Sequence, residues 1–163
     1  MKMNRLCLVV VGASLSFAAL LAPRRAAGSG IEGIGAWEGS GSGTDLEGKD
    51  LGKFTVALVR KTVAPGKIRA DGKVTLDGGR EIAFWQELED RGAAGFRLIS
   101  NNGAGGGNCF ANGICTAYEE REGGHAFAIT LVKDGADRVR ILVTELEKGR
   151  AVRFFQQSLS RKP

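Results

Sequence analysis

The side chains best suited to chemistry in this 163-residue sequence include His125, the only histidine, which follows Gly123-Gly124. A lone imidazole needs further ligands to hold a metal and an oriented partner to act as a general base. No Gly-x-Ser-x-Gly motif, which would supply a nucleophile, occurs outside the Gly- and Ser-rich segment near the N-terminus. We therefore predict that His125 is structural or surface-exposed, that the chain has no catalytic residue and no metal site, and that it is not an enzyme.

Glu119, Glu120 and Glu122 form an acidic group that would suit the paired carboxylates of glycoside chemistry. Glu119 and Glu120 point to opposite faces if the segment is a strand. We favour a solvated strand face that Arg121 interrupts.

The glycine run at 103–107 resembles a phosphate-binding loop. It lacks the Gly-Lys-Ser/Thr ending and a following helix whose dipole would attract an anion. We predict a flexible surface loop at 101–108.

Cys109 and Cys115 enclose Asn112-Gly113, a strong signal for a tight hairpin turn. Such a turn brings the two sulfurs to nearly opposite positions, and an even pair of cysteines in an exported chain indicates a disulfide. A metal site is the alternative, but two cysteines without a nearby histidine are a poor zinc set.

The N-terminus has the three parts of a secretory signal peptide: a basic start, the uncharged run 6–22, and the small-residue site Ala26-Ala27-Gly28. We place cleavage after Gly28, with a retained membrane anchor as the alternative. Removing residues 1–28 removes four basic residues and no acid, which leaves 19 basic and 18 acidic residues. The formal charge of +5 therefore belongs mostly to the leader and predicts no nucleic-acid partner.

The remaining chain predicts one all-β domain. Hydrophobic residues make up 43% of the sequence, and it contains 25 glycines but only 3 prolines. This composition is typical of short strands joined by tight turns. Strand-like segments recur at 54–60, 73–76, 80–88, 95–100, 114–122, 125–132, 138–146 and 150–160. We expect a flexible lead-in at 29–34 and, at 35–163, an antiparallel up-and-down barrel of about eight strands, with a β-sandwich as the alternative.

Gly35-Ala36-Trp37, placed ahead of this series of strands, resembles the Gly-x-Trp opening of lipocalins and other calycins. The resemblance implies that Trp37 closes one end of the barrel and that a basic side chain from a late strand, Arg150 or Arg153, stacks on it.

Aromatic side chains are the candidate contacts with a ligand or partner. In the pairs Phe84/Trp85 and Phe154/Phe155, one ring should point inward and one outward. An inward ring would line a ligand cavity, and an outward ring would mark a partner surface. The candidate binding residues are Trp37, Trp85, Phe110, Phe127 and Arg153, with Phe110 at the tip of the segment 101–114.

We therefore expect an exported, periplasmic or secreted binding protein that holds a small apolar molecule without a cofactor or a stable membrane anchor. The alternative is a protein-interaction module, such as an inhibitor of an extracytoplasmic enzyme, that uses the 101–114 loop.

Overall fold

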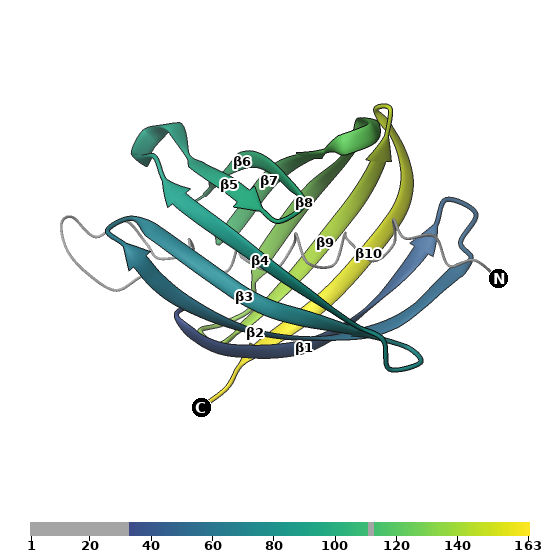
Figure 1. Cartoon of the computed structure of the whole chain (residues 1–163), viewed down its shortest axis with the longest axis horizontal. Coiled ribbons are helices and arrows are strands. Elements are labelled where there is room, and N and C mark those ends of the chain that lie inside the picture. Colours follow the sequence, from purple (N-terminus) through teal and green to yellow (C-terminus); the bar gives the residue numbers. More distant parts are fainter. Residues whose placement is uncertain (1–32, 111–112) are drawn as a thin grey trace.

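The computed structural model describes residues 33–110 and 113–163, so the expected signal peptide and most of the expected lead-in lie outside the described residues. The described chain forms ten antiparallel strands and two short 3-10 turns, η2 and η3 (Figure 1). In order, they are β1 (Gly35–Asp45), β2 (Asp50–Ala64), β3 (Lys67–Leu76), β4 (Glu81–Asp90), η2 (Gly92–Ala94), β5 (Phe96–Ser100), β6 (Gly103–Cys109), β7 (Ile114–Arg121), η3 (Glu122–Gly124), β8 (His125–Lys133), β9 (Arg138–Glu147) and β10 (Arg150–Arg161). Within these described residues, no helix has the length and apolar character to cross a bilayer.

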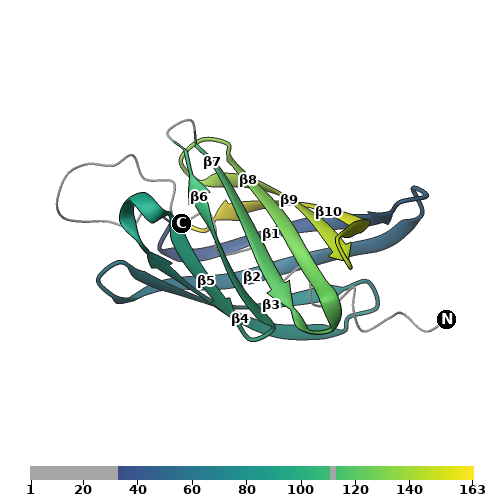
Figure 2. The same ribbon diagram turned by 90° about the horizontal axis from the view of Figure 1, so that it is seen from above.

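The strands close into a barrel. Each strand pairs with the next along the chain, and the first strand pairs with the last, from Trp37 opposite Arg161 to Asp45 opposite Arg153. Figures 1 and 2 show β1–β3 and β6–β8 on facing walls. Closure gives every strand two hydrogen-bonded neighbours and leaves no open sheet edge among the described strands.

The prediction of an antiparallel barrel is confirmed, with ten strands in place of about eight. The main difference is the segment predicted as a loop at 101–108, most of which forms β6. This strand pairs with both neighbours, for example Gly107 with Phe96 and Gly103 with Arg121. Glycine has low strand propensity, so composition indicated a loop, whereas the structure uses glycine for lack of room inside the barrel.

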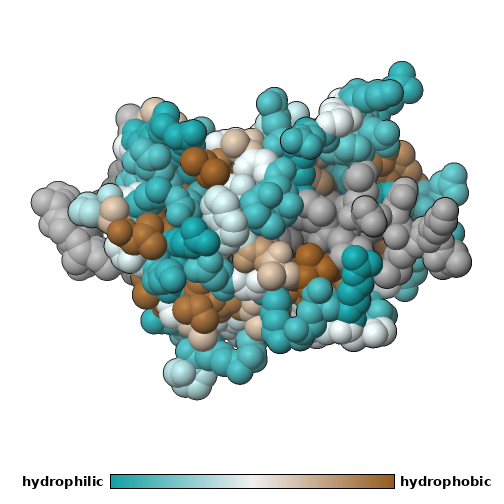
Figure 3. All heavy atoms as spheres, viewed as in Figure 1, coloured by the Kyte–Doolittle hydropathy of each residue, from teal (hydrophilic) through white to brown (hydrophobic). Residues whose placement is uncertain are grey.

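Alternate residues of each strand fill the barrel interior. On β8 and β9, Phe127, Ile129 and Leu131 lie beside the similarly inward Val139, Ile141 and Val143, all at most 2% exposed. As predicted, each aromatic pair divides between faces: Phe84 and Phe155 are buried, and Phe154 is 40% exposed. The face seen in Figure 3 is mainly hydrophilic, with separate apolar spots.

Inward glycines on β1 make room for large neighbouring side chains. A Cβ at Gly43 would lie 2.6 Å from the Phe155 ring, and one at Gly39 would lie 2.8 Å from a Leu159 methyl. The glycines therefore let side chains from β10 lie flat across the first strand.

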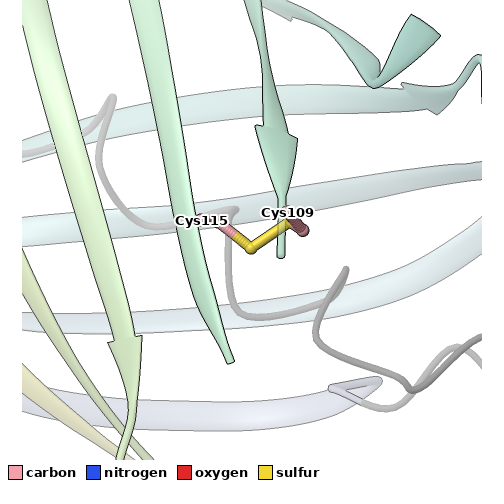
Figure 4. Close-up of a disulfide and its surroundings, with 2 residues drawn as sticks. All are labelled: Cys109 and Cys115. Carbon is pink, nitrogen blue, oxygen red and sulfur yellow. A yellow bond between two sulfur atoms is a disulfide. The ribbon is translucent and has the colours of Figure 1, made fainter. Parts of the chain in front are cut away.

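The predicted disulfide is confirmed. Cys109 and Cys115 are bonded and face each other directly across β6 and β7 (Figure 4). The hairpin beyond them is tight, because the Phe110 N–H donates to the Ile114 carbonyl at 2.8 Å.

Candidate functional site

One end of the barrel, called the mouth here, carries charged side chains on its inner surface. It lies beside the β5–β6 turn (101–102) and the 3-10 turn η3. We call the five inward groups of β7–β10 the charged cluster: Glu119, Arg121, His125, Glu145 and Arg153.

Strand register brings the charged cluster together. Glu119 on β7 is directly opposite Phe127 on β8, which is opposite Glu145 on β9, and Glu145 is opposite Arg153 on β10. Two residues nearer the mouth, Arg121 is opposite His125. Because inward side chains recur at every second residue, this pairing builds two adjacent rows of inward side chains.

Glu119 is completely buried, which corrects the expectation of a solvated strand face; Glu120, on the opposite face, is exposed. The Ser100 hydroxyl donates to Glu119 Oε1 at 2.7 Å, and Arg121 Nη2 lies 3.3 Å from the same oxygen. Ser100 in turn accepts the Gly103 N–H at 3.0 Å. The β5–β6 turn therefore fixes the hydroxyl that holds Glu119.

Glu145 is the second completely buried carboxylate. Arg153 Nη1 lies 3.1 Å from its Oε2, and His125 Nδ1 lies 3.8 Å from its Oε1. Burial raises the pKa of Glu145 above its ordinary value, although the charge of Arg153 acts in the opposite direction.

Arg121 lies at the centre of the charged cluster. Its guanidinium stacks over the Phe127 ring at 4.3 Å from the centroid, and only 6% of its side chain is exposed. Burial lowers the pKa of Arg121, although the charge of Glu119 opposes this. Arg121 Nε and Nη1 and His125 Nδ1 are buried without a hydrogen-bond partner. All three can donate, whereas both carboxylates already have partners.

The inner wall of β6 accommodates this charged cluster because it has no side chains near the mouth. A Cβ at Gly103 would lie 2.2 Å from the Glu120 carbonyl oxygen, 3.0 Å from Arg121 Cγ and 3.1 Å from Glu119 Oε1. The glycine run that resembled a phosphate loop therefore makes space for the backbone of β7 and for an ion pair.

A cavity of about 830 Å³ opens at the mouth. It is lined by Ser100, Asn101, Asn102, Gly103, Ala104, Glu120, Arg121, Glu122, His125 and Phe127. A second groove, of about 960 Å³, lies against β1, β2, β9 and β10. Many of its lining side chains are short hydroxyls, such as Ser40, Ser42 and Thr55, and it includes none of the charged cluster. The mouth is the stronger candidate because a cavity and buried titratable groups coincide there.

Trp37 lies at the opposite end of the barrel, where it is 2% exposed and donates from Nε1 to the Gly33 carbonyl at 2.8 Å. The basic side chain over its ring is Arg60 of β2, 4.9 Å from the ring centroid. The prediction that Arg150 or Arg153 stacks on Trp37 is therefore wrong, and Arg153 instead forms an ion pair with Glu145. Complete burial lowers the pKa of Arg60 to about 9.

The other two candidate aromatics lie apart from the mouth cavity. Trp85 is on the outer face of β4, with Arg69 4.7 Å from its ring centroid. Phe110, 55% exposed, follows Cys109 at the other end of the barrel. Of the five predicted binding residues, the mouth contains Phe127 in its cavity wall and Arg153 in its charged cluster.

Sequence reasoning missed Glu145, although the sequence contains a signal for it. Glu145 is in phase with Val139, Ile141 and Val143, so the alternation that makes those residues core also points the carboxylate inward. In the same way, Glu119 is in phase with Cys115 on β7.

No protein-family model and no curated protein matches the sequence. Solved structures do match. The S-type phycobiliprotein lyase CpeS of Guillardia theta has a TM-score of 0.66 at 11% identity, over 81% of this chain and 89% of that one. The Mycobacterium tuberculosis protein Rv2717c has a TM-score of 0.61 at 12% identity, over 80% and 92%.

A DUF3598-family protein of unknown function from Nostoc punctiforme has a TM-score of 0.60 at 12% identity. The match covers 83% of this chain and 53% of that protein. At these identities the likenesses show a shared architecture, a small antiparallel barrel.

Proposed function

We propose that this chain is an exported, non-enzymatic binding protein that holds a small molecule in the mouth of its barrel. The apolar part of the ligand would lie along the wall at Gly103 and Phe127, and its polar group would lie near Arg121 and His125. The observation that carries this proposal is the coincidence of the 830 Å³ cavity with buried charges that an apolar barrel interior does not need. Buried charges seldom add net stability compared with apolar residues of the same size, so a binding role accounts for them better than a structural one.

The fold supports this proposal. Barrel mouths are frequent small-molecule sites, and the structural neighbours include a phycobiliprotein lyase.

The contacts of the polar groups favour binding over catalysis. The Ser100 hydroxyl donates to Glu119 and accepts the Asn102 and Gly103 N–H groups, and Arg121 neutralises that carboxylate, so these contacts hold both groups in place. His125 Nδ1 is 3.8 Å from Glu145, beyond hydrogen-bond distance. The polar side chains of Ser100, Glu119 and Arg121 hold one another in position, as do those of Glu145 and Arg153, which is typical of a preformed binding site.

Occupation of the mouth can be measured with the apolar fluorophore N-phenyl-1-naphthylamine. We expect its emission to rise on binding to the full chain. His125→Trp places a large ring among the inward side chains that line the cavity, and it should weaken binding by at least about tenfold. Ala83→Trp, at an exposed position of β4, is the matched control and should bind as the native chain does. Absent enhancement, or equal binding by both variants, would contradict the proposal.

Export is tested separately. When the full gene product is made in a bacterial host, the periplasmic or secreted fraction should contain a chain that begins at Ser29. An intact mass that includes residues 1–28 would contradict cleavage at this site.

A protein-interaction role is the second candidate, and it is now confined to the disulfide-closed hairpin. Phe110 is 55% exposed there, beside Cys109, whereas the expected long loop is a paired strand. Phe110→Ala should leave fluorophore binding unchanged, because the ring lies at the opposite end of the barrel from the mouth.

A further inference from the structure

The hydrogen-bonding groups left over at the mouth are nitrogen atoms that can donate. Arg121 Nε and Nη1 and His125 Nδ1 have no hydrogen-bond partner, while Glu119 and Glu145 accept from Ser100, Arg121 and Arg153. A buried donor without an acceptor is unfavourable, so a ligand group that reaches these nitrogens is favoured if it is an acceptor.

The charged cluster is electrically balanced before a ligand enters. By formal charge, its two guanidinium groups offset its two carboxylates. Phe127 lies between Glu119 and Glu145 in the same row, so the balance is held against an apolar wall. An added negative charge would leave this wall with one uncompensated charge, which a low-dielectric surrounding strongly disfavours.

One proton restores the balance, and the structure places a site for it. Glu145 Oε1 lies 3.8 Å from His125 Nδ1, beyond hydrogen-bond distance, so a proton on this carboxyl displaces no hydrogen bond from the imidazole. Burial already raises the pKa of Glu145, which favours uptake there.

Other charged groups near Glu145 do not replace this proton. Arg121 and Arg153 are already ion-paired, and Glu119 is held by Ser100 and Arg121. Asp45 of β1, opposite Arg153, accepts backbone N–H groups of its own turn at 2.9 and 3.0 Å. The remaining charged neighbours are on the rim: the exposed Glu120, Glu122, Glu147 and Lys148.

We propose that the mouth binds a singly charged organic anion, a carboxylate on an apolar body, and takes up one proton with it. This inference rests on the proposed function and adds the charge of the ligand and the coupled protonation. Its consequence is an affinity that rises as the pH falls.

The probe is 4-phenylbutyrate, and its neutral twin is 4-phenylbutan-1-ol, both titrated calorimetrically into the full chain. Two buffers with different ionisation enthalpies report the protons taken up. We expect about one proton per bound phenylbutyrate and an affinity that falls about tenfold per pH unit between about pH 6 and pH 8. The alcohol should bind more weakly, without proton uptake.

Two variants identify the proton site. Glu145→Gln removes one negative charge from the charged cluster, so phenylbutyrate should bind it without proton uptake and with little pH dependence. His125→Asn removes the imidazole but keeps the Glu145 carboxyl, so the phenylbutyrate that it binds should still bring about one proton, and loss of that uptake would overturn the assignment even if Glu145→Gln does not fold. Glu81→Gln, an exposed outer carboxylate paired with Lys73, is the control and should behave as the native chain.

The outcomes separate the two proposals. If N-phenyl-1-naphthylamine binds at the mouth but phenylbutyrate binds no better than the alcohol, or binds without a proton, this inference is overturned and the proposed function stands. If the fluorophore itself does not bind at the mouth, the proposed function fails.

Discussion

Glu145 shows how one residue in the wrong place for packing can indicate function. It occupies an inward position of β9 that its neighbours fill with Val and Ile, and it is completely buried. The residue is stabilised by Arg153 on one side and approached by His125 on the other. Its charge therefore depends on groups from three strands.

The raised pKa of Glu145 makes a prediction about stability. Because the folded pKa lies above the unfolded value of about 4.3, the protonated native form is favoured. The contribution of this residue is full below the unfolded pKa and is lost as the pH rises through the folded pKa. Urea unfolding at a series of pH values should therefore show Glu145→Gln gaining stability relative to the native chain as the pH rises above about 4.3. A constant difference between the two would contradict the shift.

Trp37 provides a second test at the scale of the residue. Arg60→Ala removes the side chain that covers the indole and should destabilise the barrel by roughly 2–4 kcal/mol, because it leaves a void at a buried position. In a Trp85→Phe background, the emission of Trp37 should shift to the red. Arg153→Ala should leave that emission unchanged. An equal shift in both variants would instead support the original prediction that Arg153 covers the indole.

At the scale of the element, β6 is a strand built from residues that usually break strands. Its glycines are required first by the close approach of the neighbouring backbone, because a Cβ would lie 2.2 Å from the Glu120 carbonyl oxygen at Gly103 and 2.0 Å from that of Thr116 at Gly107. Side chains add to the crowding: Glu119 and Arg121 at Gly103, and Phe96 at Gly107. No composition rule could predict this strand, because the need for glycine comes from atoms of the neighbouring strands.

Gly103→Ala tests that explanation. The new methyl would meet the Glu120 carbonyl oxygen as well as Arg121 Cγ and Glu119 Oε1, so we expect a loss of about 1–3 kcal/mol in the free energy of unfolding and weaker fluorophore binding at the mouth. Ala83→Ser on the outer face of β4 is the control and should change neither. Native stability together with native binding in Gly103→Ala would refute the steric role.

The disulfide between β6 and β7 should contribute modestly. The two cysteines are six residues apart and already paired by the strands, so the bond removes little chain entropy. Reduction, or replacement of both cysteines by alanine, should lower the free energy of unfolding by at most about 2 kcal/mol. Loss of the folded state on reduction would show that the hairpin does not form without the bond.

Sequence patterns predicted the elements better than the site. Period-2 alternation located the core of β8 and β9, and the hairpin signal located the disulfide. The charged cluster was not predicted as a unit, since it depends on register across four strands. Arg60 was missed because the resemblance to the Gly-x-Trp motif predicted a partner for Trp37 on a late strand. In the structure, β1 and β2 pair directly at the end of the barrel that contains Trp37, and β2 supplies the arginine.

At the scale of the whole molecule, the pairing of β1 with β10 closes the barrel. Hydrogen exchange should show the amides of these two strands protected to the same degree as those of β9, because each has hydrogen-bonded neighbours on both sides. Fast exchange confined to β1 and β10 would mean that the barrel opens along this seam.

That seam also determines when the molecule can fold. Trp37 of β1 pairs with Arg161 of β10, so this contact joins residues from nearly opposite ends of the domain sequence and is expected to form slowly. Until the final strand is available, the first has only one partner and the ring stays open. We therefore expect the barrel to become compact only after its last strand has been synthesised.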